Sequence, residues 1–284
     1  MANLGVLSAL GDKETIIFSD ELNHASIIDG CRLSSSQVKI FPHNAFSDLE
    51  KLVKKSVLKK KIIITEGIFS MDGDFSNLKE ISKISTENNC FLIVDDAHGD
   101  FVVGNNVLKN YSGTPAYFNV VKEVDVHISS LSKGLGCFGG YVSSSRLICE
   151  YLINKSRPFI FTSALPDFLC EIANLSLEAA KEGKQQKKLY KNIDLFYKVL
   201  EENKLLNIKK VRFSPIIPII IGDEKKAMDI SKKLLKKGFF VQAIRYPTVK
   251  KSQSRLRVSL SSEHKDAQII SFIDTLSKLI KTSN

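Results

Sequence analysis

The sequence contains no tryptophan, only three methionines, and no apolar run long enough to cross a membrane. Its first residues lack the basic segment and the long apolar core of a secretory signal peptide. The five cysteines form no CxxC pair and show no zinc-site spacing. We therefore expect no bound metal and no membrane segment, and reduced, mostly buried thiols in a cytoplasmic protein.

The 284 residues are 43% hydrophobic and 25% charged, which suits a globular chain with one large and one smaller domain. Lys and Arg (41) outnumber Asp and Glu (31), which gives a formal net charge of +10. Because the lysines are spread over several predicted helices, we interpret this excess as solvated surface and expect no nucleic-acid partner.

Short β-branched runs alternate with helical patterns in the first half of the chain. Continuous apolar runs such as residues 62–64 and 91–94 are typical of strands that are covered on both faces. This alternation predicts an α/β fold with a mostly parallel sheet. The expected strands are Thr15–Phe18, Val38–Phe41, Ile62–Thr65, Phe91–Asp95, Val126–Ser130 and Tyr141–Ser144.

Helix signals and a polar stretch predict the rest of the organisation. Ser47 and Glu50 have the spacing of a capping box, and further helices are expected to begin near Asn77 and after Pro166. The polar stretch Lys181–Lys188 predicts a boundary between a large domain, 1–180, and a smaller C-terminal α/β domain, 181–284. The smaller domain is expected to contain strands Ile216–Ile221, Phe240–Ile244 and Leu256–Leu260, and a last helix after Ser262.

Four polar segments follow predicted strands, at the positions where open α/β folds bind ligands. The first, IVDDAHGD (93–100), contains Asp95 and His98. A carboxylate at a strand end can pair with a cationic ring nitrogen, although it can also bind Mg²⁺ or cap a helix. The second, SSLSKGLGCFGG (129–140), contains Lys133 among glycines that let the backbone approach a ligand. A lysine in such a loop is usually a solvated charge, but facing a ligand it can form a Schiff base once its pKa is lowered.

The other two segments supply a serine and a histidine. TEGIFSMDGD (65–74) contains Ser70 and is otherwise explained by a plain turn. ELNHASIIDG (21–30) contains His24, which either caps a helix or stacks on a flat ring. A lysine, an aspartate and a stacking histidine together indicate a pyridoxal 5′-phosphate (PLP) site, in which the aspartate keeps the ring nitrogen protonated.

The motifs LNHASIIDG, TEGIFSMDGD, VDDAHG and SLSKGLG, in this order, resemble those of the α-oxoamine synthases. These are fold-type I PLP enzymes with an aspartate aminotransferase-like fold. RPFIFTSALP (157–166), AIRYPTV (243–249) and SRLRVSL (254–260) are similar to the branch that forms 8-amino-7-oxononanoate. The resemblance covers essentially the whole chain, but this sequence lacks the family's N-terminal segment.

The resemblance implies a role for each matching residue at the cofactor. Lys133 holds PLP and later moves a substrate proton, Asp95 pairs with the pyridine nitrogen, and His98 bonds the ring hydroxyl. His24 stacks on the ring and contacts substrate. Further cofactor contacts are implied for Ser70, Ser130 and, at the phosphate of the cofactor in the other subunit of a homodimer, Thr162. Substrate contacts are implied for Thr248, Arg245 and Arg257, with an arginine gripping the amino-acid carboxylate.

The implied reaction is a decarboxylative condensation of L-alanine with a pimeloyl thioester of coenzyme A or a carrier protein. It yields 8-amino-7-oxononanoate, CO₂ and free thiol in biotin biosynthesis. Two alternatives stay open: another PLP activity, such as a glycine C-acetyltransferase or an aminotransferase, or an inactive truncated product.

Overall fold

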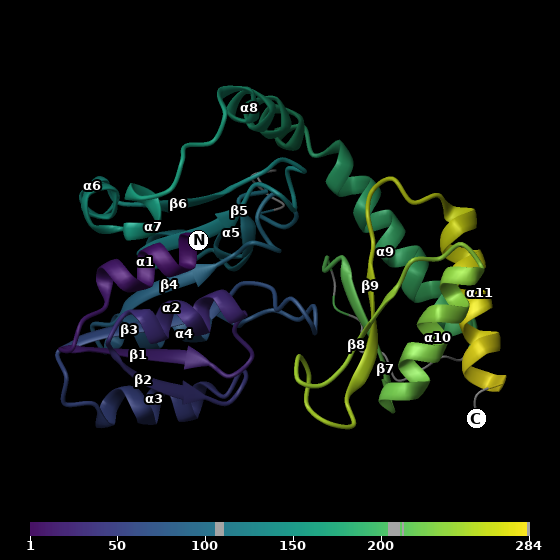
Figure 1. Cartoon of the computed structure of the whole chain (residues 1–284), viewed down its shortest axis with the longest axis horizontal. Helices are drawn as coiled ribbons and strands as arrows, with labels where there is room; N and C mark the ends of the chain where they lie inside the picture. The colour runs from purple at the N-terminus through teal and green to yellow at the C-terminus, as the bar shows by residue number, and fades with distance from the viewer. Residues whose placement is uncertain (106–110, 204–210, 212, 283–284) are drawn as a thin grey trace. The chain divides into compact units, whose positions relative to one another are not determined.

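The computed structural model describes residues 1–105, 111–203, 211 and 213–282. The chain forms two compact units, the first comprising residues 1–69 and 75–183 and the second residues 70–74 and 184–284 (Figure 1). The expected boundary was residue 180, and the chain passes between the units at Gly183. The assignment of the two parts as a cofactor-binding domain and a smaller domain stays a prediction.

The first unit is built on a six-stranded sheet with the strand order β2-β1-β3-β4-β5-β6. All neighbours in this order pair in parallel except β6, which pairs antiparallel with β5. The mostly parallel α/β fold expected from the sequence is therefore confirmed. The strands are β1 (Thr15–Asp20), β2 (Gln37–Phe41), β3 (Lys60–Glu66), β4 (Phe91–Asp95), β5 (Val126–Ser130) and β6 (Gly140–Ser144).

Helices follow the expected starts at two of three positions. Asn77 and Pro166 precede α4 and α8 as their N-caps. The expected capping box at Ser47 is wrong. A turn closed by the Ala45 N–H and the Pro42 carbonyl (2.9 Å) precedes α3, and the N-cap is Ala45, two residues before Ser47. The helical segments are α1 (Ala2–Leu10), α2 (Ala25–Leu33), α3 (Phe46–Lys55), α4 (Leu78–Glu87), α5 (Gly113–Phe118), the 3₁₀ turn η1 (Val121–Glu123), α6 (Arg146–Lys155), α7 (Arg157–Ile160) and α8 (Asp167–Lys181).

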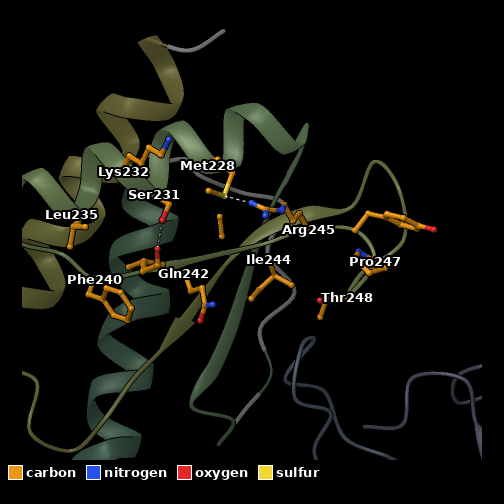
Figure 2. A pocket seen from close by; sticks show the side chains of 13 residues that line it. Met228, Ser231, Lys232, Leu235, Phe240, Gln242, Ile244, Arg245, Pro247 and Thr248 are labelled. Carbon is orange, nitrogen blue, oxygen red and sulfur yellow. Dashed lines mark hydrogen bonds between the residues drawn. The ribbon is translucent and has the colours of Figure 1, made fainter. Parts of the chain in front are cut away.

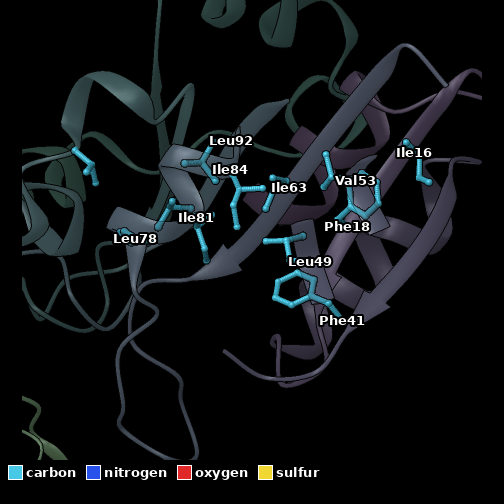
Figure 3. Packing of buried hydrophobic residues seen from close by; sticks show 12 residues of the cluster. Ile16, Phe18, Phe41, Leu49, Val53, Ile63, Leu78, Ile81, Ile84 and Leu92 are labelled. Carbon is cyan, nitrogen blue, oxygen red and sulfur yellow. The ribbon is translucent and has the colours of Figure 1, made fainter. Parts of the chain in front are cut away.

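Side chains that alternate along the central strands enter two hydrophobic clusters, one on each face of the sheet. On one face, Ile63 of β3 packs in a cluster with Leu49 of α3 and Ile81 of α4 (Figure 3). On the other face, Ile64 joins a cluster with Leu7 of α1 and with residues of α2. All of these side chains are fully buried, which explains why the strands read as continuous apolar runs.

The second unit contains an antiparallel sheet with the order β7-β9-β8. Each strand expected in this region is present, and α10 contacts all three strands. Ile230 and Leu234 of α10 are buried, as are Ile273 and Leu276 of α11. The elements are α9 (Lys184–Glu202), β7 (Ile216–Gly222), α10 (Glu224–Lys236), β8 (Gln242–Ile244), β9 (Ser254–Ser259) and α11 (Asp266–Thr282).

Residues 70–74 belong to the second unit, although we expected them in the larger domain. Arg255 of β9 is 2% exposed and donates from Nη1 to the carboxylate of Asp72. Arg257 donates from Nε to the carbonyl of Ser70 at 2.6 Å. Both arginines lie far along the chain from this segment, so its local sequence carries no sign of the pairing.

In the described part of the chain, no helix has both the length and the apolar character needed to cross a bilayer. All five cysteines are free, but only Cys31 is buried. The expectation of mostly buried thiols is therefore wrong. Cys170, for example, is exposed because it lies on α8, a helix that buries no side chain.

A cluster of ionisable side chains lies where β4, β5 and β6 pair. The fully buried Asp96 accepts hydrogen bonds from the backbone N–H (2.6 Å) and the hydroxyl (2.8 Å) of Thr114. The Tyr141 hydroxyl donates to Asp100, and Asp100 Oδ2 lies 3.4 Å from Nε2 of His127. This last distance is that of an ion pair with poor hydrogen-bond alignment.

Burial raises the pKa of Asp96 to about 7, against the opposing effects of His127 and of the Thr114 hydrogen bonds. For His127, burial lowers the pKa, but the neighbouring Asp100 and Asp96 outweigh burial and the net shift is upward. Both groups therefore bind protons more tightly in the folded chain than in the unfolded one.

This proton binding predicts that the free energy of unfolding falls as pH rises from about 4 to about 7, because the unfolded Asp96 has already lost its proton in this range. In Asp96→Asn, which can still pair with Thr114, the fall should shrink by a few kcal/mol, since one pKa unit corresponds to about 1.4 kcal/mol. Urea denaturation at about pH 5 and about pH 7.5 measures the change.

The matched control is Asp48→Asn, at a half-buried position of α3. It should keep the wild-type difference between the two pH values. An Asp96→Asn variant with the same pH dependence as wild type would contradict the raised pKa.

Candidate active site

The four polar segments singled out in the sequence all follow strands of the parallel sheet. β1, β3, β4 and β5 run in the same direction and end at Asp20, Glu66, Asp95 and Ser130. Their carboxyl ends therefore lie along one edge of the sheet, the edge at which α/β folds bind ligands.

Asp95 is the last residue of β4 and is 7% exposed. Its Oδ1 accepts a hydrogen bond from the Ala97 N–H at 3.1 Å. Its Oδ2 accepts from Nδ2 of Asn3, in α1, at 2.6 Å. The two bonds hold the carboxylate in one orientation at the edge of the sheet. A carboxylate that pairs with a ring nitrogen needs such a fixed orientation.

His24 is the N-cap of α2, and its ring remains exposed. Nδ1 accepts the backbone N–H of Ser26 at 3.2 Å and lies 2.8 Å from the Ser26 hydroxyl. The helix-cap interpretation of His24 is therefore correct. It does not exclude stacking, because capping uses one ring nitrogen and leaves the ring face open to a ligand.

Lys133 lies in a tight loop between β5 and β6, and its side chain is exposed. The loop is closed by hydrogen bonds from Leu131 N to Gly139 O (3.0 Å) and from Cys137 N to Leu131 O (2.8 Å). The backbone next to Lys133 has no room for a larger residue, since a Cβ on Gly134 would lie 2.6 Å from the Asp100 carbonyl oxygen. Gly134 therefore lets the loop pack against the backbone of Asp100.

The other predicted residues of the first unit are more scattered. Ser130 ends β5, and its hydroxyl lies 2.7 Å from that of Ser132. His98 is half-buried in the turn that follows Asp95. Thr162 is exposed in the segment between α7 and α8.

Ser70, Arg245, Thr248 and Arg257 belong to the second unit. Ser70 is 9% exposed. Arg257 is half-buried, and besides Ser70 it donates from Nη1 to the Ser259 hydroxyl at 2.7 Å. Nη2 makes no hydrogen bond to a described residue, so this nitrogen is available to a carboxylate. Burial lowers the pKa of Arg257 from its ordinary value, but the guanidinium stays charged.

Arg245 and Thr248 line a cavity of about 510 Å³ between α10 and β8 (Figure 2). Arg245 is exposed and points toward Met228, with Nη1 3.1 Å from the sulfur. Its Nε lies 3.3 Å from a carboxylate oxygen of Glu224. Arg245 is therefore already paired with an acid, which favours Arg257 over Arg245 as the arginine for a substrate carboxylate.

Sequence reasoning missed Asn3 and Ser26. Ser26 lies inside the ELNHASIIDG segment, but no role was assigned to it. Asn3 is separated from Asp95 by 92 positions, and an asparagine in a short apolar helix gives no local sign of function. Contacts in the folded chain were needed to find it.

The residues present in the first unit fit PLP. A buried, oriented carboxylate at a strand end suits a pyridinium nitrogen, an open imidazole face suits an aromatic ring, and an exposed amine suits an aldehyde. Hydroxyls at Ser130 and Ser132 next to the lysine add polar contacts.

Comparison with known proteins agrees with this chemistry. The family model of aminotransferase class I and II matches residues 1–276. The chain is 39% identical over 286 residues to an 8-amino-7-oxononanoate synthase of Thermoanaerobacter pseudethanolicus, covering 100% of this chain and 71% of that protein. It is 37% identical over 281 residues to 8-amino-7-oxononanoate synthase 1 of Bacillus subtilis, covering 98% and 70% of the two chains.

Solved structures share the fold. A serine palmitoyltransferase from S. paucimobilis with a bound PLP–myriocin aldimine superimposes with a TM-score of 0.93 at 27% identity, over 99% of this chain and 70% of that one. The 8-amino-7-oxononanoate synthase of Francisella tularensis superimposes with a TM-score of 0.85 at 33% identity, over 99% and 80%. The chain therefore belongs to the aminotransferase class I and II family, among the PLP-dependent α-oxoamine synthases of fold type I, which are acyltransferases.

Proposed function

We propose that this chain condenses L-alanine with a pimeloyl thioester and releases 8-amino-7-oxononanoate, CO₂ and free thiol in biotin biosynthesis. The names of the curated relatives, at 39% and 37% identity over nearly the whole chain, support this choice of substrates. The observation that carries the proposal is the edge of the parallel sheet, where Asp95 ends β4 while His24 and the Lys133 loop follow the ends of β1 and β5.

In the proposed reaction the alanine Cα forms a bond to the thioester carbonyl carbon, the thiol departs, and the alanine carboxylate is lost as CO₂. PLP supplies an aldehyde that condenses with amines and a pyridinium ring that withdraws electrons from the carbon next to the bound nitrogen. The protein must then hold that ring, orient the amino acid and move protons.

Lys133 is proposed to hold the cofactor and to move the alanine α-proton as a general base. Backbone hydrogen bonds close the loop that carries Lys133, and the exposure of Lys133 leaves it accessible to an aldehyde. Asp95 is proposed to pair with the ring nitrogen and His24 to stack on the ring and contact substrate. His98, Ser130 and Ser70 are proposed to bind other polar atoms of the cofactor.

Arg257 is proposed to bind the alanine carboxylate. Arg255, two residues earlier, is fully engaged, with hydrogen bonds from all three nitrogens to Gln253, Asp72 and Met71. Arg245 is paired with Glu224. Arg257 retains an unused nitrogen, and a half-buried guanidinium binds a carboxylate more strongly than an exposed one. Thr248 is proposed as a further substrate contact, and Arg245 as a secondary one.

The chain is also proposed to form a homodimer. Large apolar side chains are exposed on α6, α7 and α8, including Leu147 (77%), Phe159 (64%) and Leu175 (72%). Soluble monomers rarely expose so many large apolar groups on neighbouring elements. Thr162 lies in the same region and is proposed to reach the phosphate of the cofactor in the other subunit.

The five free cysteines fit a reducing compartment, and we propose the cytoplasm.

The lysine assignment predicts where PLP becomes attached. After borohydride reduction of the PLP-loaded protein, peptide mass spectrometry should find the pyridoxyl group on Lys133. Lys133→Ala should lose this label and the visible absorbance of bound PLP, and its condensation rate should fall about 10²–10⁴-fold as expected for a missing proton-transfer group. Lys122→Ala, at an exposed position of η1, is the control and should behave as wild type. Label at another lysine, with normal absorbance in Lys133→Ala, would refute the assignment.

The carboxylate assignment predicts a selective effect on amino-acid binding. Arg257→Lys keeps the charge but loses the planar fork, so KM for L-alanine should rise about tenfold or more, while KM for pimeloyl-CoA changes little. Arg245→Lys is the matched comparison and should have a smaller effect on KM for L-alanine. The reverse ranking of the two variants would assign the carboxylate to Arg245.

Parallel assays with glycine and acetyl-CoA test the choice of substrates, and faster turnover with this pair would favour glycine C-acetyltransferase.

The dimer proposal predicts a mass of twice 31.7 kDa by light scattering. Leu175→Glu places a charge on the exposed apolar surface of α8 and should shift the chain toward the monomer. Val57→Glu is the control, because Val57 is 93% exposed but lies after α3, away from these helices in the sequence. A wild-type mass of 31.7 kDa would contradict the proposal.

A further inference from the structure

We infer that Asn3 is a positioning residue that orients Asp95 directly and His24 through Ser26. The inference rests on the proposed function in one respect, namely that Asp95 and His24 contact PLP. The hydrogen bonds themselves do not depend on it.

The side-chain amide of Asn3 uses both of its hydrogens. Nδ2 lies 2.6 Å from Asp95 Oδ2 and 2.9 Å from the Ser26 hydroxyl oxygen. Because an ionised carboxylate only accepts hydrogen bonds, the nitrogen of the amide must face Asp95. This requirement fixes which way the amide points and makes the contact a charge-assisted bond.

The unpaired amide oxygen of Asn3 indicates that an asparagine at this position serves to donate hydrogen bonds from Nδ2. Asn3 is 7% exposed, and its Oδ1 is buried with no hydrogen-bond partner among the described residues. A buried acceptor without a partner costs free energy. A smaller apolar residue would avoid that cost, so the asparagine is explained by its two donated bonds.

Ser26 carries the constraint from Asn3 to His24. Its hydroxyl oxygen accepts from Asn3, which leaves its hydrogen to donate to Nδ1 of His24, 2.8 Å away. The backbone N–H of Ser26 also donates to Nδ1, at 3.2 Å. Two donors directed at Nδ1 require that nitrogen to be unprotonated, so the neutral ring carries its hydrogen on Nε2.

Close packing of α1 on α2 holds Asn3 at this distance from Ser26. Gly30 of α2 faces α1, and a Cβ on it would lie 2.7 Å from Leu7 Cδ1 and 3.0 Å from the Asn3 carbonyl oxygen. The two helices therefore touch through a glycine. One side chain on α1 thereby fixes a carboxylate at the end of β4 and an imidazole at the start of α2.

The first test measures His24 in the cofactor-free, full-length chain by ¹⁵N NMR of the imidazole nitrogens. At alkaline pH, wild type should show an unprotonated Nδ1 and a protonated Nε2. Ser26→Ala removes the hydroxyl donor and should shift the nitrogens toward a mixture of the two tautomers. A protonated Nδ1 in neutral wild type overturns the relay, whether or not the chain is an enzyme.

The second test measures the dissociation constant of PLP by absorbance titration. Asn3→Ala should weaken PLP binding about tenfold or more, since a bond to a charged group is lost. Ser8→Ala, also on α1, removes bonds to the Leu4 and Gly5 carbonyls of the same helix and should bind as wild type. Equal affinity of Asn3→Ala and wild type overturns the inference.

A third variant separates positioning from a general loss of packing. Asn3→Asp matches the shape of the native side chain but puts a second carboxylate against Asp95. At about pH 8, Asn3→Asp should bind PLP more weakly than Asn3→Ala. Toward about pH 5 its affinity should recover relative to Asn3→Ala, because the introduced carboxyl group gains a proton and can donate a hydrogen bond to Asp95. No recovery of Asn3→Asp relative to Asn3→Ala overturns the inference and points to packing alone. If wild type binds no PLP, the proposed function fails and the imidazole measurement alone decides the relay.

Discussion

The site depends on two consecutive carboxylates at the end of β4, which receive opposite environments. Asp95 accepts hydrogen bonds from Asn3 and Ala97 at the edge of the sheet. Asp96, the residue after the strand, is fully buried and bonds to Thr114. Burial raises the pKa of Asp96 to about 7, which makes it a structural group that favours its proton. Asp95 accepts two oriented hydrogen bonds at the carboxyl edge of the sheet, which suits a partner for a cationic ring.

The parallel sheet determines what else can reach that carboxylate. Strands that run in one direction end at one edge, so His24 and the Lys133 loop follow strand ends on the same side of the sheet as Asp95. Gly134, next to Lys133, allows the loop to pack against the backbone of Asp100. The arrangement supplies an amine, an anion and an aromatic face, which is the minimum that PLP chemistry requires. Membership of the α-oxoamine synthases agrees with this arrangement. The arrangement itself does not name the substrates, and alanine and a pimeloyl thioester are the proposed pair.

Much of the first unit could be predicted from sequence because its signals are local. Apolar runs identified β3 and β4, and the polar segments after them were correctly placed at strand ends. Signals that depend on distant partners were missed. Asn3 is defined by a bond to a residue 92 positions away, and residues 70–74 join the second unit through Arg255 and Arg257. The capping box at Ser47 failed because the N-cap of α3 is Ala45, two residues earlier.

The proposed function depends on the Asp95 carboxylate keeping the pyridine nitrogen of PLP protonated. The most direct measurement is the ¹⁵N chemical shift of that nitrogen, using PLP labelled with ¹⁵N in the ring and bound to wild type and to Asp95→Asn. A neutral amide of the same shape removes the charge but leaves the packing, so the account predicts a protonated ring nitrogen in wild type and an unprotonated one in the variant at neutral pH. A ring nitrogen with the same shift in both proteins would contradict it.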